Sequence, residues 1–270
     1  MVRFHPDRRT GREHDGWGVL TVAGSSGRVD TGRARLFARH GALAESIRWF
    51  GGPGQNPGPW EIPLEQFRTR VAALRRECDR VLVAGTSFGA EAALLTGAHT
   101  AGVDAVVAFA PSDVVWAGVR PDGTQTSHWT RAGHPLPFVP FVPWTPPDDP
   151  PSYRRLYELS RSADPEAVAA AAIPVERIRA LIVVAGRDDR VWPSATHAEA
   201  IADRRRRHGL PTTVVLDPGA GHRAVLPGEP RVTAGARMAR GGSEAADRRL
   251  GAAAWDQIRR LMTGAPEPEQ

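Results

Sequence analysis

Short apolar runs alternate with segments of helical periodicity along almost the whole chain. The apolar runs have the length and composition of buried strands, and they lie at residues 18–23, 43–49, 80–84, 103–110, 180–185 and 212–216. Apolar residues at helical intervals predict helices at residues 31–40, 64–77, 90–98, 194–208 and 244–262. Apolar strands separated by helices are typical of a mostly parallel sheet covered on both faces, so the predicted fold class is α/β.

One stretch, residues 112–164, interrupts this alternation because proline and aromatic residues dominate it, as in PLPFVPFVPWTPPDDPP. Repeated prolines exclude a central strand or a long helix, and a long irregular segment inside a domain is commonly a lid or binding loop. The alternative is a surface excursion that covers the edge of the sheet. The aromatic residues favour a lid, so we expect Phe138, Phe141 and Trp144 to contact the substrate.

Length and composition restrict the domain organisation. The chain has 270 residues, of which 41% are hydrophobic and 24% are charged, as is common in globular proteins. We expect one domain over residues 1–263, with the lid inside it, and a frayed tail over residues 264–270. No apolar run approaches the roughly 18 residues of a membrane span, and residues 1–15 lack the apolar core of a secretory signal. We therefore expect a cytoplasmic protein without a membrane partner.

Charge and cysteine content exclude further classes. All 35 basic residues are arginine and the net charge is +5, but the arginines are scattered among acidic residues, so no nucleic-acid partner is expected. The single cysteine, Cys78, excludes a disulfide framework and a cysteine-based zinc site. Neither a metal nor another cofactor is expected.

The segment Gly85-Thr86-Ser87-Phe88-Gly89 has the pattern G-x-S-x-G. The apolar strand before it and the helix after it are the context of a nucleophile elbow, in which glycines allow the sharp turn that exposes the serine. The backbone N–H of Phe88 would then stabilise a developing oxyanion, together with an N–H near Ser25 in the loop after the strand at residues 18–23. The alternative is a tight strand-to-helix turn whose serine has no chemical role.

A nucleophilic serine needs a base, and the base needs an orienting acid. Among nine histidines, His222 is the best candidate because it lies in a glycine-rich loop after a late strand, at the sheet edge expected to carry Ser87. Asp188 and Asp189 follow the strand at residues 180–185, which gives the order Ser, Asp, His. Spacing alone leaves the choice between these two aspartates open, and either could instead cap the next helix.

Several segments together resemble the C-terminal α/β-hydrolase domain of the acyl-CoA thioesterase and bile acid-CoA:amino acid N-acyltransferase family. The matching segments are RARLFARHGALAESIRWF, GTSFGAEAALLTGA, IPVERIRALIVVAGRDDRVWPS, DPGAGH and GGSEAADRRLGAAAWDQIRRL. They extend from about Trp17 to Met262, and the GRDDRVWPS and GGSEAADRRLGAAAW segments are much more specific than G-x-S-x-G. Larger members of the family carry an immunoglobulin-like domain before the hydrolase domain, and we expect this chain to lack it.

The resemblance implies an α/β-hydrolase fold with Ser87 as nucleophile, Asp189 as triad acid and His222 as base. It also implies an acyl thioester substrate, with coenzyme A or a carrier protein's pantetheine as the thiol. Family members that conjugate amino acids tend to use cysteine as nucleophile, so serine here implies hydrolysis. Two alternatives remain: an acyltransferase or cyclase that passes the acyl group to an amine or hydroxyl, and a binding protein without catalysis. The sequence does not indicate the oligomeric state.

Overall fold

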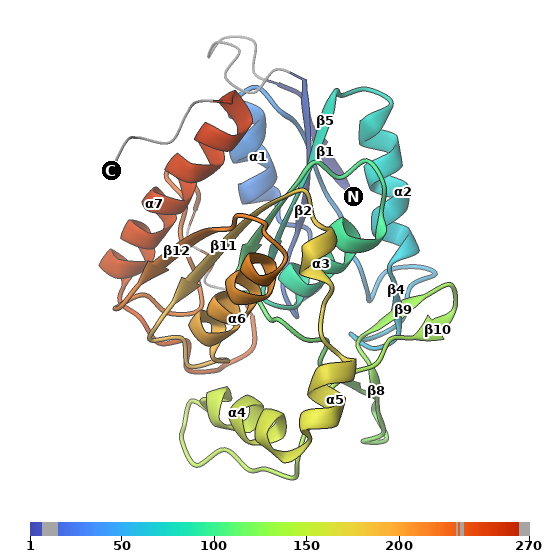
Figure 1. Ribbon diagram of the computed structural model, residues 1–270, viewed down its shortest axis with the longest axis vertical. Helices are drawn as coiled ribbons and strands as arrows, with labels where there is room; N and C mark the ends of the chain where they lie inside the picture. Colours follow the sequence, from blue (N-terminus) through green and yellow to red (C-terminus); the bar gives the residue numbers. More distant parts are fainter. Residues whose placement is uncertain (7–15, 231, 233–234, 265–270) are drawn as a thin grey trace.

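A seven-stranded sheet forms the centre of the structure, a computed structural model that describes residues 1–6, 16–230, 232 and 235–264 (Figure 1). Across the sheet the strands follow the order β1 (Val2–Phe4), β3 (Leu43–Ser46), β2 (Trp17–Val22), β5 (Arg80–Thr86), β6 (Ala105–Phe109), β11 (Ala180–Gly186) and β12 (Thr213–Asp217). All neighbouring pairs are parallel except β1 and β3, which are antiparallel. The predicted α/β fold with a mostly parallel sheet is confirmed.

Helices cover both faces of this sheet, which explains why its central strands are mostly apolar. In β5, Val81 and Val83 pack into the cluster under one set of helices, whereas Leu82 and Ala84 pack into the cluster on the opposite face. The first face carries α2 (Glu65–Arg75), α3 (Phe88–His99) and α6 (Ser194–Arg207). The second face carries α1 (Thr31–Arg39) and α7 (Glu244–Thr263).

The observed helices begin and end within about two residues of the predicted positions, because local signals mark their ends. The Asp30 side chain accepts the backbone N–H of Arg33 at the start of α1, and the Ser243 side chain accepts that of Ala246 at the start of α7. Helix α7 ends at Gly264, whose φ of 70° lies in the left-handed region. Residues 265–270 of the predicted tail lie outside the described residues.

Two parts of the chain differ from the prediction. The short edge strand β1 was not predicted, since three half-buried residues give no clear apolar run. The segment at residues 112–164 is less irregular than expected, because it includes β7 (Ala117–Val119), β8 (Gln125–Ser127), β9 (Trp129–Arg131), β10 (His134–Pro135) and α4 (Arg154–Ala163). Strand β9 also pairs with β4 (Ile62–Pro63), which ties the segment to the main body.

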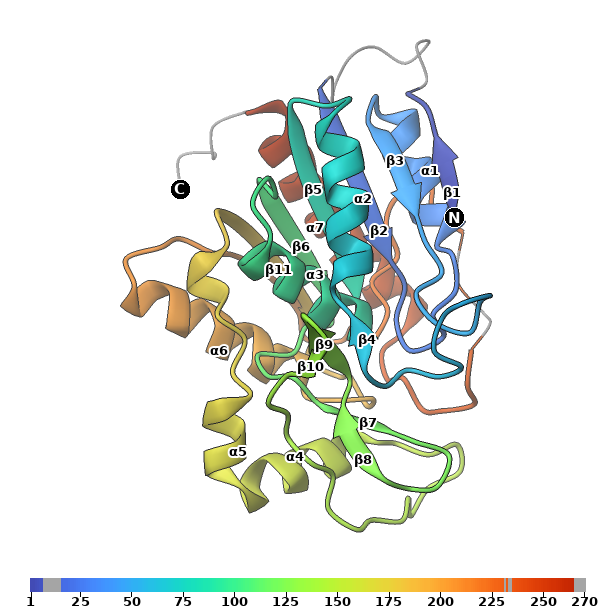
Figure 2. The ribbon, with the colours of Figure 1, turned by 90° about the vertical axis from the view of Figure 1, so that its right-hand side faces the viewer.

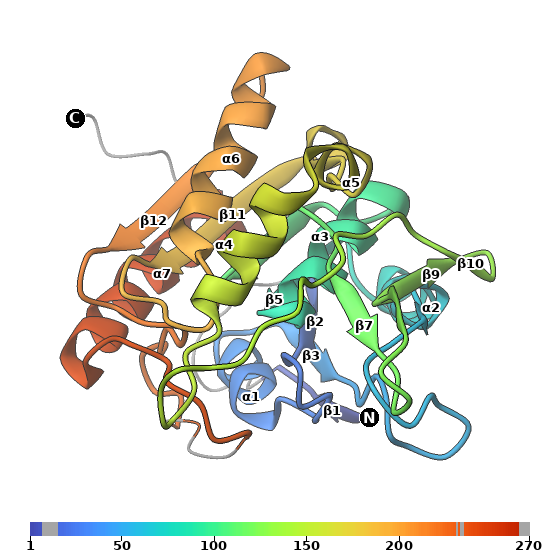
Figure 3. The same cartoon turned by 90° about the horizontal axis from the view of Figure 1, so that it is seen from below.

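The segment at residues 112–164 lies beyond one end of the central strands, as Figures 2 and 3 show from two sides. It follows β6 and leads into α4, α5 (Pro165–Ala170), the 3₁₀ helix η1 (Val175–Arg177) and then β11. Backbone N–H groups of Tyr153 and Arg154 donate to the carbonyl of Arg190, in the loop after β11. The segment therefore contacts the edge at which the parallel strands end, where α/β proteins bind their ligands.

Candidate active site

Ser87 lies in a strained turn between β5 and α3. Its φ of 59° and ψ of −127° are unusual for a residue with a side chain, and its N–H donates to the carbonyl of Phe109 in the neighbouring strand, at 2.9 Å. A methyl group on Gly85 would lie 1.9 Å from the carbonyl oxygen of Gly89, and one on Gly89 would lie 2.4 Å from that of Ala23. Only glycine fits at both positions, so the G-x-S-x-G segment has the backbone of a nucleophile elbow.

His222 and Asp189 form a buried hydrogen-bonded pair. The distance from His222 Nδ1 to Asp189 Oδ2 is 2.8 Å, and the exposed fractions of the two residues are 7% and 0%. The other carboxylate oxygen, Oδ1, accepts the backbone N–H groups of Val191 and Trp192 at 2.8 and 3.3 Å. Because an ionised carboxylate only accepts hydrogen bonds, Nδ1 of His222 is the donor, and Nε2 of the neutral ring keeps its lone pair.

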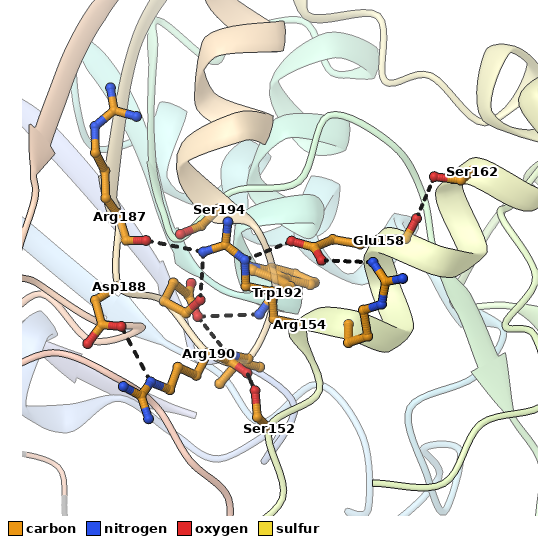
Figure 4. A network of polar contacts seen from close by, with 12 residues as sticks. Ser152, Arg154, Glu158, Ser162, Arg187, Asp188, Arg190, Trp192 and Ser194 are labelled. Atoms are coloured by element: carbon orange, nitrogen blue, oxygen red, sulfur yellow. Dashed lines mark hydrogen bonds and ion pairs between the residues drawn. The ribbon is translucent and has the colours of Figure 1, made fainter. Parts of the chain in front are cut away.

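The adjacent aspartate, Asp188, points away from His222. Its Oδ2 accepts the N–H of Gly242 at 2.8 Å. Its Oδ1 lies 3.4 Å from Nε of Arg190 (Figure 4). Its side chain is 43% exposed. Asp188 therefore connects the loop after β11 to the loop before α7, and of the two aspartates only Asp189 contacts His222.

The loop that carries Asp189 is also tied to α4. Arg154 Nη1 donates to the carbonyl oxygens of Arg187 and Asp189 at 3.1 and 3.3 Å, while its Nε donates to Glu158 at 2.8 Å (Figure 4). Ser152 Oγ donates to the carbonyl of Arg190 at 2.9 Å. The end of the segment at residues 112–164 is thus fixed to the loop that holds Asp189.

Trp192 connects the elbow with His222. Its ring contacts Phe88, the residue after Ser87, with a centroid distance of 5.2 Å, and it contacts the His222 ring at 5.8 Å. Ser87 itself is 7% exposed. The structure therefore brings the elbow, His222 and Asp189 to the same edge of the sheet, around one tryptophan.

The loop after β2 passes directly over Ser87, but its nearest residue is Gly24. A methyl group on Gly24 would lie 3.1 Å from Cβ and 3.7 Å from Oγ of Ser87. Ser25 is the next residue and is exposed. Phe88 is the first residue of α3, where backbone N–H groups have no acceptor within the helix. The sequence gives no indication of a role for Gly24, because glycine has no side chain.

The three predicted lid residues lie in different surroundings. Phe141 stacks on Trp116 at a centroid distance of 5.8 Å and meets the edge of Tyr157 at 5.3 Å. Tyr157 in turn contacts Trp192 at 5.4 Å, so Phe141 belongs to an aromatic cluster that reaches His222. Phe138 packs half-buried against the core under α3, and Trp144 contacts Tyr153 at 5.8 Å.

Two buried polar residues lie beside the elbow, and no sequence motif marks either of them. His128 stacks on the Phe88 ring at 4.0 Å, and burial lowers its pKa to about 3, although a backbone contact with Ala117 acts in the opposite direction. Glu91, one turn into α3, accepts the indole N–H of Trp129 at 2.9 Å, and burial raises its pKa well above the usual value. His128 is therefore uncharged at neutral pH, burial favours the uncharged form of Glu91, and the surroundings of the elbow are of low polarity.

A second histidine–aspartate pair, between buried His197 and half-buried Asp113, lies outside this site. His197 Nδ1 and Asp113 Oδ1 are 2.5 Å apart, and Arg161 donates to both oxygens of Asp113 at 2.8 Å. Burial alone would raise the pKa of Asp113, but His197 and Arg161 outweigh it and hold this pKa at about 2. The pair fastens the chain after β6 to α6 and α4. The sequence singled out neither residue, because their proximity arises only from the tertiary fold.

Metal ligation and membrane insertion have no support among the described residues. They contain no group of three or more His, Cys, Asp and Glu side chains that could hold a metal ion. None of the helices in the part of the chain that the structure describes is long and apolar enough to span a membrane.

Comparison with known proteins adds the family. Residues 64–263 match the family described as BAAT / Acyl-CoA thioester hydrolase C terminal. The chain belongs to this family. The match begins at the start of α2 and ends at the end of α7, so it includes the elbow, Asp189 and His222. No curated protein sequence matches the chain significantly.

Solved structures with little sequence identity share the fold of this family member. A thermophilic esterase from Thermogutta terrifontis has 14% identity and a TM-score of 0.57, covering 98% of this chain and 90% of its own. An esterase domain from Rhodothermus marinus has 14% identity and a TM-score of 0.51, covering 96% and 91%. A puromycin-hydrolyzing peptidase from Mycobacterium tuberculosis has 13% identity and a TM-score of 0.57, covering 99% and 38%. The chain is an α/β hydrolase by family and by fold.

Proposed function

We propose that this α/β hydrolase cleaves acyl thioesters through an acyl-enzyme on Ser87, with His222 as base and Asp189 as its orienting acid. The observation that supports this most is the 2.8 Å contact between His222 Nδ1 and Asp189 Oδ2, at the sheet edge that carries the elbow. Folding alone does not require these three residue types together, which argues against a binding protein without catalysis. The order Ser, Asp, His along the chain is that of other α/β hydrolases.

In the proposed first half-reaction, the Ser87 hydroxyl loses its proton to Nε2 of His222 while its oxygen bonds to the acyl carbon. The carbonyl oxygen becomes an oxyanion, which accepts the N–H of Phe88 and an N–H of the loop after β2, at Ser25 or at its neighbour Gly24. The carbon–sulfur bond then breaks, and His222 returns the proton to the departing sulfur. Asp189 stabilises the imidazolium during this exchange.

In the second half-reaction, water gives a proton to His222 and attacks the acyl-enzyme, which releases the carboxylic acid and restores Ser87. The surroundings support this chemistry, because His128 is uncharged and burial favours the uncharged form of Glu91. The resulting low polarity strengthens interactions with the oxyanion. The thiol of the substrate is coenzyme A or the pantetheine of a carrier protein. This part of the proposal rests on family membership.

Hydrolysis of a panel of acyl-CoA and acyl-pantetheine thioesters, followed by release of the free thiol, tests the proposal. We expect turnover that disappears in Ser87→Ala and persists in Ser162→Ala, which removes an exposed hydroxyl on α4. A fluorophosphonate probe should label the wild type and Ser162→Ala but not Ser87→Ala. Labelling that survives Ser87→Ala, or thioester turnover without it, would contradict the assignment.

Product analysis with and without an added amine or alcohol separates hydrolysis from acyl transfer. Serine as nucleophile favours hydrolysis, so we expect the free acid as the main product even when amine is present. Amide or ester as the main product would identify an acyltransferase instead. Cleavage of simple oxygen esters with no thioester turnover would refute the substrate class while leaving the triad in place.

A further inference from the structure

A basic cleft lies at the end of α3 that is farthest from Ser87. Its volume is about 540 Å³, and its walls come from α2, the C-terminal end of α3, the β9–β10 hairpin and η1. We call it the arginine cleft, after three of its lining residues, Arg68, Arg131 and Arg177. Figure 2 shows α2, α3, β9 and β10 together on one side of the sheet.

The hairpin that forms one wall is held firmly in place. The backbone N–H of Leu64 donates to the carbonyl of Thr130 at 3.0 Å, and the N–H of Ala132 donates to Glu65 Oε1 at 3.0 Å. Arg131 Nη1 lies 2.8 Å from Nδ1 of His99, the last residue of α3. The cleft is therefore built by contacts between separate elements of the fold.

The three arginines of the cleft have no carboxylate partner within ion-pair distance among the described residues. All three side chains are exposed, whereas several other arginines pair with a carboxylate, for example Arg70 with Glu45 at 2.8 Å. Glu65 is the one acidic residue that lines the cleft, and one of its oxygens already accepts a backbone N–H. The lining thus carries three positive charges against one negative charge.

His99 also lines the cleft, adds no negative charge, and has a pKa that depends on the positive charge of the arginines. Because Arg131 can only donate, Nδ1 of His99 accepts, so the ring is neutral in this arrangement. Burial lowers the pKa of His99, and repulsion by Arg131 and Arg177 lowers it further. The charged groups that line the cleft around this ring are Arg68, Arg131, Arg177 and Glu65.

We propose that the arginine cleft binds a small organic phosphate of nucleotide size. Guanidinium groups match phosphate oxygens with paired hydrogen bonds, and three of them without carboxylate partners leave that capacity free. The volume is in the range of small-molecule sites and exceeds the space that one phosphate needs. Leu64, Leu95 and Ala98 also line it, and the half-buried Ala98 offers an apolar contact to the body of the ligand.

This site is separate from the proposed acyl-transfer centre and does not depend on it. Helix α3 has 12 residues and begins next to Ser87, so about 18 Å of helix lies between the elbow and His99. Loss of binding in the cleft and loss of thioester hydrolysis are therefore independent outcomes.

Titration calorimetry of the full chain with ADP, adenosine and inorganic phosphate tests the proposal. We expect saturable binding of ADP, weaker binding of phosphate and no detectable binding of adenosine. Arg131→Ala and Arg177→Ala should each weaken ADP binding by about tenfold or more, as expected for the loss of a hydrogen bond to a charged group. Arg68→Ala gives a third variant on an exposed helix surface, in case Arg131→Ala disturbs the hairpin.

Arg248→Ala is the matched control, since it removes one exposed arginine from α7 on the opposite face of the sheet. It should leave ADP affinity unchanged. Equal affinities for ADP and adenosine, or equal losses in Arg248→Ala and the cleft variants, would overturn the proposal. Citrate binding as tightly as ADP would also overturn it, because the cleft would then accept any multivalent anion.

The imidazole signal of His99 provides a second readout. A bound phosphate offsets the repulsion by Arg131 and Arg177, so ADP should raise the pKa of His99 measured by NMR. By linkage, ADP affinity should then increase as pH falls through that pKa. His99→Gln removes this contribution, while the titration of ADP itself stays the same in both proteins. A His99 pKa that ADP leaves unchanged would place the ligand elsewhere and refute the site.

Discussion

Replacing Asp189 with asparagine separates the proposed triad acid from its neighbour, because the surroundings allow the new amide only one orientation. Oδ1 accepts the N–H groups of Val191 and Trp192, whereas Oδ2 contacts His222 Nδ1. An amide nitrogen at the Oδ1 position would leave both N–H groups without an acceptor in a fully buried site, at about 1–3 kcal/mol each. The amide nitrogen therefore takes the Oδ2 position and donates to the imidazole.

That donation reverses the tautomer of His222. Nδ1 becomes the acceptor and the proton moves to Nε2, which can then no longer take the proton of Ser87. By analogy with the equivalent substitution in a serine protease, we expect Asp189→Asn to lower kcat by about 10³–10⁴-fold. This loss corresponds to about 4–5.5 kcal/mol of activation free energy. The KM for the acyl thioester should change little, because Asp189 is fully buried behind its contact with His222.

Asp188→Asn is the matched control. Its acceptor to the N–H of Gly242 survives in asparagine, and the contact with Arg190 is long and largely exposed, so kcat should fall by less than about tenfold. Steady-state thioester hydrolysis and thermal unfolding should be measured on both variants. If Asp188→Asn were the more damaging change, or if Asp189→Asn kept more than about a tenth of the wild-type kcat, the assignment would be wrong.

Three further results are expected. Phe141→Ala should raise the KM for long acyl chains about tenfold relative to the KM for acetyl thioesters. Trp144→Ala should raise it less, because the Trp144 ring contacts Tyr153. Equal changes for both chain lengths would mean that these residues have a purely structural role. Because the pKa of Glu91 is raised, the free energy of unfolding of the wild type should fall as pH rises above about 4.5. In urea unfolding measured from pH 5 to 8, Glu91→Gln should show a smaller decline, and parallel curves for the two proteins would show that Glu91 is ionised. Ser87→Cys should form more amide product from added glycine than the wild type does, and a purely hydrolytic variant would count against this.

The elbow could be predicted from the sequence because its constraints are local. Gly85 and Gly89 are required by contacts within a few residues of Ser87 and with the adjacent strand. The G-x-S-x-G motif is therefore enough to predict the backbone geometry of the turn. The apolar runs likewise identified the strands, because a sheet covered on both faces leaves few polar positions in them. Strand β1 was missed for the opposite reason, since it lies at the edge and is half-buried.

The choice between Asp188 and Asp189 depended on contacts far apart in the sequence. The loop before α7 packs so tightly on Asp188 that a methyl group on Gly241 would lie 1.6 Å from its carbonyl oxygen. These contacts fix the backbone and turn the Asp189 side chain toward His222. The sequence did not indicate His128 and Glu91 for a similar reason, because their burial beside Phe88 and Trp129 arises only in the folded chain.

The attachment of α4 to the loop of Asp189 has an evolutionary consequence. Ser152 and Arg154 hold that loop from one side, whereas residues 145–148, a few positions earlier, are exposed. Insertions or deletions in this proline-rich stretch can therefore accumulate without displacing the orienting acid. Under the proposed function, relatives of this protein can diverge in the length and composition of the stretch, and so in the acyl groups they accept, while Asp189 keeps its contact with His222.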